Sequence, residues 1–203
     1  MYTMKRFTLV ATIMSLCVAV APLLQAQERD PMVIPNMQGE MVLDGSLDEA
    51  AWQNASVVTL DVVTAPLINA PAPVATEVRI IENSETLYVG FIAKDPDPSQ
   101  IRAYFRDRDR VWSNDLVGIK LDTFNDSRLA YQFFVNPYGV QSDSIENEMT
   151  GRESDAWDAI WDSAGQITDD GFVVEMAIPL HILNFKEGDE HKIWGAEFVR
   201  FYP

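Results

Sequence analysis

The sequence predicts an all-β protein, an antiparallel β-sandwich of jelly-roll type with one or two short helices. Three observations support this prediction. Short runs in which apolar residues alternate with other residues recur along the chain, as in half-buried strands. Turn-forming residues separate these runs at regular intervals, and only one or two segments have a helical pattern. The most regular alternation, over residues 112–141, predicts a long antiparallel hairpin.

Residues 1–26 have the pattern of a secretory signal peptide. Lys5 and Arg6 form a basic start, residues 7–24 are mostly apolar, and Ala26 supplies a small residue for cleavage. The alternative, a transmembrane anchor, would need about 20 apolar residues, more than this run contains. We therefore expect export to the periplasm or the outer membrane.

Residues 27–40 form a polar lead-in, and residues 41–203 are expected to form one domain, because no linker, repeat or low-complexity tract divides them. Cys17, the only cysteine, lies in the signal peptide, so no disulfide supports the domain. Loss of the two basic residues of the signal peptide changes the net charge from −16 to −18. This charge disfavours nucleic acid and anionic membranes as partners and suits neutral ligands or divalent cations.

The elements before the central hairpin follow from similar patterns. Ser46 and Glu49 have the spacing of a capping box, which predicts a short helix over residues 46–54 with Trp52 on its buried side. Residues 64–73 contain three prolines and predict a loop at a binding rim. Strands are expected at residues 41–43, 57–63, 74–82 and 86–94, and extended chain at residues 101–105.

The central hairpin joins a strand over residues 116–121 to a strand over residues 129–135 through a turn at residues 122–128. One face of this hairpin is apolar and is expected in the core. The other face, which carries Gly118 and Gln132, is expected to stay partly exposed to solvent. Strands at 139–145, 164–168, 172–178 and 192–202, a polar loop at 146–154 and a helical turn at 179–183 are expected to follow.

Several segments together resemble carbohydrate-binding modules of family 9. The resemblance extends from about residue 42 to residue 200 and is strongest at residues 43–52 (LDGSLDEAAW), 86–90 (TLYVG), 112–115 (WSND) and 171–179 (GFVVEMAIP). Residues 122–126, 134–139 and 157–161 are most similar to one branch, in which the module is the N-terminal domain of large bacterial outer-membrane-associated proteins. That branch implies a covalent outer-membrane domain C-terminal to this chain.

The resemblance implies a non-enzymatic β-sandwich that holds an oligosaccharide or polysaccharide between aromatic rings, often with structural calcium. The stacking tryptophan of sugar-binding members lies three residues before an aspartate, and here corresponds to Trp112 before Asp115. Those members carry an acidic residue and an arginine at the positions of Gly118 and Phe134. Their second stacking tryptophan would lie beyond Pro203, so the chain is expected to stop before its last strand.

Further ligand contacts are expected around Trp112, whose own alternative role is to anchor a loop. The amides of Gln132, Asn136 and Gln141 could donate hydrogen bonds to sugar hydroxyls, or could be solvated. If residues 106–110 are extended, three arginines share one side of the chain with Trp112 and could hold an acidic sugar, or could pair with their aspartate neighbours. These arginines are Arg106, Arg108 and Arg110, of which Arg110 is taken as the candidate ligand residue.

Two groups of oxygen-bearing side chains are candidate calcium sites, although neither has the spacing of an EF-hand. The second group also leaves open a glycoside hydrolase, which needs two carboxylates facing one cleft. The first group is Asp122, Asn125 and Asp126, and the second is Asp155, Asp158 and Asp162.

These observations predict a secreted β-sandwich that binds carbohydrate without catalysis and takes part in polysaccharide utilisation. One alternative is an interaction or assembly domain of an outer-membrane protein that has lost sugar binding, which Gly118 and Phe134 favour. A second is part of a hydrolase of O-glycosyl bonds. A third is a haem-binding electron-transfer domain. The haem ligands would be His181 or His191 with Met149 or Met176, although both histidines are expected at the surface.

Overall fold

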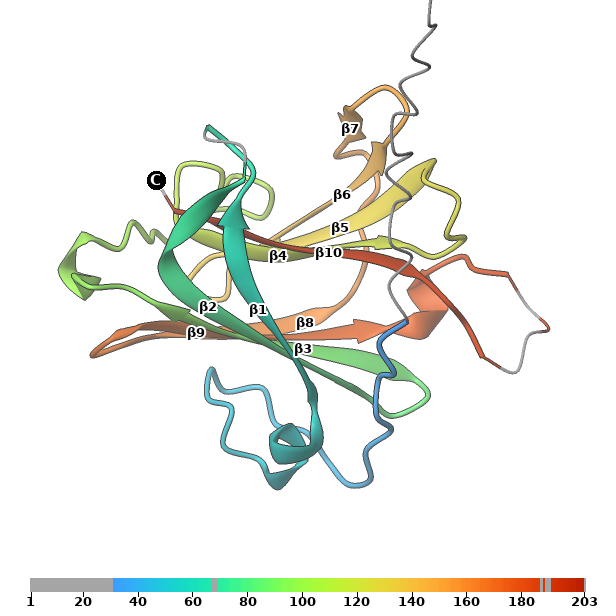
Figure 1. The fold of residues 1–203 in the computed structure, drawn as a ribbon, viewed down its shortest axis with the longest axis horizontal. Coiled ribbons are helices and arrows are strands. Elements are labelled where there is room, and N and C mark those ends of the chain that lie inside the picture. Colours follow the sequence, from blue (N-terminus) through green and yellow to red (C-terminus); the bar gives the residue numbers. More distant parts are fainter. Residues whose placement is uncertain (1–30, 67–68, 187, 189–190, 203) are drawn as a thin grey trace, which may run out of the picture. The chain divides into compact units, whose positions relative to one another are not determined.

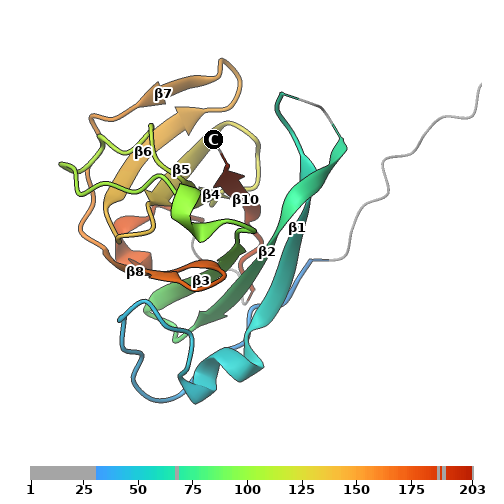
Figure 2. The same ribbon diagram turned by 90° about the vertical axis from the view of Figure 1, so that its left-hand side faces the viewer.

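The protein, described here from a computed structural model, contains a sandwich of two five-stranded antiparallel sheets, which confirms the predicted fold class (Figures 1 and 2). The structure describes residues 31–66, 69–186, 188 and 191–202, so the predicted signal peptide lies outside it. The strand orders are β1-β2-β3-β9-β8 and β10-β4-β5-β6-β7. The strands are β1 (Ser56–Val63), β2 (Ala70–Glu82), β3 (Thr86–Lys94), β4 (Leu116–Asp122), β5 (Leu129–Val135), β6 (Gln141–Asn147), β7 (Arg152–Ser154), β8 (Asp162–Thr168), β9 (Gly171–Pro179) and β10 (Gly195–Phe201). Three short 3₁₀ helices accompany them: η1 (Ala50–Asn54), η2 (Pro98–Gln100) and η3 (Leu180–Ile182).

The core lies between the two sheets and uses one face of each central strand. Ile119 of β4 and Phe133 of β5 are directly paired, and they belong to the same buried cluster as Val89 and Phe91 of β3. Side chains of β2 and β9 complete the cluster: Val78, Ile80, Phe172, Val174, Met176 and Ile178. The predicted core face of the central hairpin is confirmed.

β2 is longer than the sequence predicts, and the expected loop over residues 64–73 is wrong in its second half. Residues 70–75 pair only with β1, with Pro71 opposite Val62, and pairing with β3 begins at Thr76. Proline has no N–H for a ladder, but it is tolerated where one edge of a strand is free. The proline-rich segment therefore forms part of a two-stranded ribbon.

The segment before β1 packs on the outer face of the first sheet, where Trp52 forms a small buried cluster with Met37 and Ile81. Gly90 of β3 makes room for it, because a Cβ there would collide with Leu47 and lie 3.2 Å from Trp52 Cη2. The burial of Trp52 was expected.

Two local predictions for this segment are wrong. Only η1 forms where a longer helix was expected, and Glu49 accepts a hydrogen bond from Val42 N instead of closing a capping box. Residues 41–43 form no strand. Packing of Trp52 on the sheet holds this segment, so the chain needs neither element.

Glu175 of β9 holds the same segment from beneath. Its Oε2 accepts hydrogen bonds from Asp44 N and Gly45 N at 2.9 and 2.8 Å, while Oε1 is buried without a partner. Burial raises the pKa of Glu175 to about 7, and the two amides and the Trp52 indole only partly oppose this rise.

The remaining boundaries differ by a few residues from those predicted. β6 begins at Gln141 instead of residue 139, and the expected polar loop at residues 146–154 contains β7, which pairs with the end of β6. No helix among the described residues is long and apolar enough to cross a membrane.

Candidate functional site

Trp112 lies at the surface beside the second sheet, just before β4, and its side chain is 48% exposed. Its ring packs edge-on against Phe134 of β5, with centroids 5.1 Å apart, and against Phe201 of β10, with centroids 6.0 Å apart. These contacts fix the indole in place while half of it stays accessible. A pyranose ring presents a C–H face that can pack on such an indole.

Gly118 and Phe134 lie opposite each other on β4 and β5, on the outer face of the sheet. The Phe134 ring occupies the space over Gly118, since a Cβ at Gly118 would overlap that ring and lie 2.7 Å from Phe133 O. Phe134 is fully buried beneath Trp112 and Phe201. At these two positions an aromatic contact therefore takes the place of the charged pair that the resemblance implies.

The expectation that this outer face is partly exposed is wrong, because its polar side chains are buried in contact with one another. Gln132 is completely buried, donates to Glu146 Oε2 at 2.5 Å and accepts from Ser144 Oγ at 2.8 Å. Glu146 also pairs with Lys120 at 2.8 Å. The amide of Gln132 is thus engaged within the sheet.

Asn136, another predicted ligand residue, joins two loops. Its amide nitrogen donates to Tyr104 O at 2.9 Å and to Asn114 Oδ1 at 3.2 Å, and its oxygen accepts from Tyr138 N and Val140 N. All of its hydrogen-bonding capacity is used, and the side chain is fully buried. Asn136 therefore fixes the loop that carries Trp112 against the turn after β5.

Asp115 is also buried, so it does not face a ligand beside Trp112. Its Oδ2 accepts from Arg102 N at 2.8 Å, and Oδ1 has no partner. Burial raises its pKa, while the amide of Arg102 and the nearby Arg200 guanidinium lower it by less. The carboxylate anchors residues 101–102 beside the start of β4.

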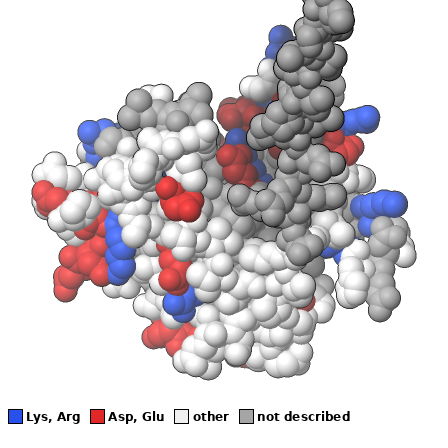
Figure 3. Space-filling model, in the orientation of Figure 1, with Lys and Arg blue, Asp and Glu red and all other residues white. Residues whose placement is uncertain are grey.

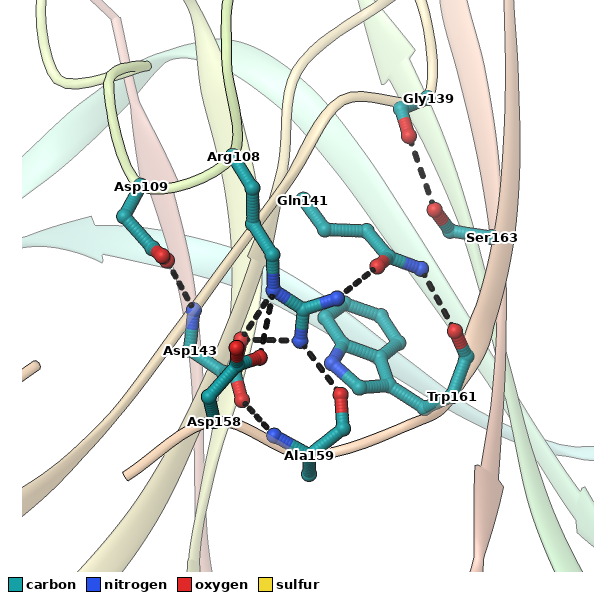
Figure 4. A network of polar contacts seen from close by, with 9 residues as sticks. All are labelled: Arg108, Asp109, Gly139, Gln141, Asp143, Asp158, Ala159, Trp161 and Ser163. Atoms are coloured by element: carbon teal, nitrogen blue, oxygen red, sulfur yellow. Dashed lines mark hydrogen bonds and ion pairs between the residues drawn. The ribbon is translucent and has the colours of Figure 1, made fainter. Parts of the chain in front are cut away.

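Residues 106–110 are not extended, because the chain turns at Asp109, whose φ is +66°. The three arginines therefore do not share one side. Arg108 turns inward, where it bonds Asp143 and Ala159 O, donates to Gln141 Oε1 at 2.6 Å and pairs with Asp158 at 3.2 Å (Figure 4).

Arg108 also lies 5.9 Å from the centroid of the Trp161 ring, and Gln141 donates to Trp161 O. The guanidinium is thus used within the protein, as is the Gln141 side chain. Arg106 and Arg110 are exposed. Neither has a hydrogen bond or ion pair from its guanidinium to another described residue.

Sequence reasoning missed a second aromatic feature near Trp112. Phe105 and Tyr138 stack in parallel, with centroids 4.6 Å apart and planes inclined by 7°. Phe105 is 79% exposed. The signal was available, because large aromatic residues stand in two otherwise polar loops, but only the fold brings those loops together.

The first predicted calcium site does not offer a set of free oxygens. Asp122 Oδ1 accepts from Phe124 N and Oδ2 from Ser127 N, so this carboxylate caps the β4–β5 turn. Asp126 lies 3.7 Å from the Arg128 guanidinium. Across the described residues no group of three or more His, Cys, Asp or Glu side chains could hold a metal ion. The residues present do not fit calcium here.

The second predicted calcium site, which also motivated the hydrolase, lies in an exposed loop. Asp155, Asp158 and Asp162 are all exposed, and Asp158 pairs with Arg108. His181 and His191 are at the surface, as expected, whereas Met176 is in the core. This arrangement supports neither two carboxylates in a cleft nor a haem-ligand pair.

The comparisons with known proteins agree with this geometry. The family described as "Carbohydrate family 9 binding domain-like" matches residues 43–199. The chain belongs to this family. The family is one of non-catalytic carbohydrate-binding modules, so the domain is not an enzyme. No curated protein is significantly similar to the chain.

Solved structures share the fold of this family member at low sequence identity. A family 9 carbohydrate-binding module from Caldicellulosiruptor kristjanssonii in complex with cellotriose has a TM-score of 0.53 and 21% identity, over 81% of this chain and 74% of that one. The same module with glucose gives 0.53, 20%, 81% and 74%. A putative carbohydrate-binding protein from Bacteroides uniformis gives 0.53 and 17%, over 73% and 72%.

Proposed function

We propose that this domain binds an oligosaccharide or polysaccharide without catalysis, with Trp112 as the ring on which a sugar stacks. The observation that carries the proposal is the half-exposed indole held by two edge-on aromatic contacts. A ring that is already fixed loses little conformational freedom on binding, which favours its use as a platform.

Family membership supports this proposal, and so does the binding of cellotriose and glucose by the structural neighbour. An open hollow of about 360 Å³ between β2 and the end of β3 is a weaker candidate. No aromatic side chain lines it; its lining is Pro73, Val74, Ala75, Lys94, Asp95, Pro96 and Asp170. We further propose that the domain is exported and holds glycan for an envelope protein that takes part in polysaccharide utilisation.

Isothermal titration of the full chain with xylo-, cello- and gluco-oligosaccharides tests the proposal. Trp112→Ala should abolish binding, and Trp112→Tyr should retain part of it, because a smaller ring still stacks. Phe124→Ala is the matched control, since Phe124 is equally exposed (53%) but lies in the β4–β5 turn. Binding that survives in Trp112→Ala would exclude Trp112 as the platform.

The filled space over Gly118 favours a second candidate, an assembly domain. If the folded wild-type chain binds no sugar of any class, the Phe134 ring has replaced the polar contacts that sugar hydroxyls need. The exposed aromatic rings would then serve a protein partner. Titration against the neighbouring domain of the parent protein would test that function.

A further inference from the structure

The loop before β4 differs in charge from the rest of this acidic protein. Between Ile101 and Trp112, three arginines are exposed against a single exposed carboxylate, that of Asp107. On the face shown in Figure 3, charged groups of both signs lie separately between uncharged areas, so no uniform negative field covers the molecule. A local positive site can exist in such a surface.

Arg110 lies beside the proposed stacking residue. Val111 is fully buried, whereas Arg110 and Trp112 on either side of it are exposed. Neighbours of an inward-pointing residue are directed outward together. The guanidinium of Arg110 therefore lies at the surface next to the indole, and no described residue neutralises it.

Arg106 is placed in a similar way, next to the second aromatic feature. Its guanidinium carbon lies 5.4 Å from the centroid of the Tyr104 ring, and the adjacent Phe105 stacks on Tyr138. The hydrogen bonds of Asn136 to Tyr104 and of Asn114 to Tyr104 N hold this part of the loop. An exposed cation thus accompanies each exposed aromatic group.

We propose that this arginine–aromatic face, made of Tyr104, Phe105, Arg106, Arg110, Trp112 and Tyr138, binds glycans that carry carboxylates, with uronate units as the preferred ligands. The inference rests on the proposed function and deepens it by naming the class of sugar. Guanidinium and carboxylate groups form two parallel, charge-assisted hydrogen bonds. A neutral sugar offers no such partner to Arg110.

Titration of the full chain with oligogalacturonate and with a neutral cello-oligosaccharide of equal length tests the inference. We expect the uronate ligand to bind about tenfold more tightly at low salt, as charge-assisted hydrogen bonds would give. Arg110→Gln should remove this preference and leave neutral binding unchanged, and Arg106→Gln should reduce it. Arg152→Gln in β7, also exposed, is the control and should bind like wild type.

The outcomes separate this inference from the proposed function. Equal affinity for both ligands, or a uronate preference that survives in the Arg106→Gln/Arg110→Gln double variant, would overturn the inference while leaving carbohydrate binding intact. Absence of binding to either ligand would overturn both. A preference that disappears at 0.5 M salt in wild type and is missing at low salt in Arg110→Gln would support the role of the guanidinium.

Discussion

Glu175 makes the stability of this domain depend on pH in an unusual direction. Its carboxyl is almost completely buried, and its pKa is raised from 4.5 to about 7. Between these pH values the folded state holds a proton that the unfolded chain releases. The free energy of unfolding must therefore fall as the pH rises from 4.5 to 7.

The raised pKa corresponds to about 3 kcal/mol, present below pH 4.5 and lost above pH 7. Glu175→Gln removes the titrating group and keeps an oxygen to accept from Asp44 N and Gly45 N. Its unfolding free energy should thus lose this part of the pH dependence and exceed that of wild type by up to about 3 kcal/mol at pH 8.

Urea unfolding followed by tryptophan fluorescence from pH 4 to 8.5 measures this difference. Glu85→Gln, an exposed carboxylate in the β2–β3 turn, is the matched control and should follow the wild-type curve. Asp115 and Asp143 also have raised pKa values through burial, so the comparison of wild type with Glu175→Gln isolates one group. Parallel curves for these two proteins would refute the reasoning.

Three further changes test the contacts around the site. Gly118→Ala should destabilise the fold by about 1–3 kcal/mol, because the new Cβ displaces the Phe134 ring, and fluorescence should report a changed Trp112 environment. Arg108→Ala should cost roughly 3 kcal/mol in urea unfolding, since it leaves the buried Asp143 without its cation. Asn136→Ala should weaken sugar binding and lower stability by roughly 1–3 kcal/mol, because the buried groups of two loops lose their partners. Wild-type values for these variants would contradict the respective contact.

The sequence predicted the strands well because a period of two survives wherever one face of a strand meets the core. It failed at Pro71, where the usual meaning of proline was overridden by a free strand edge. It also failed on the outer face of the central hairpin. Polar residues such as Gln132 have the alternation of a solvated face, but side chains from β6 and β4 cover them.

The candidate site shows a similar division. Trp112 could be singled out from its position before a strand, since that needs only local information. The roles of Asn136 and Arg108 could not, because their partners are 32 and 35 residues away in the chain. The Phe105–Tyr138 stack depends in the same way on contact between two loops.

The Gly118–Phe134 contact and the exposed Arg110 bear on the same question, how this family member could recognise a sugar. The first removes hydrogen-bonding groups from the sheet beneath Trp112, because an aromatic ring fills that space. The second leaves a charged donor beside Trp112 on the preceding loop. A ligand that stacks on the indole would then be oriented from the loop instead of the sheet. This arrangement favours a sugar whose charge lies at the ring edge over one identified only by its hydroxyls.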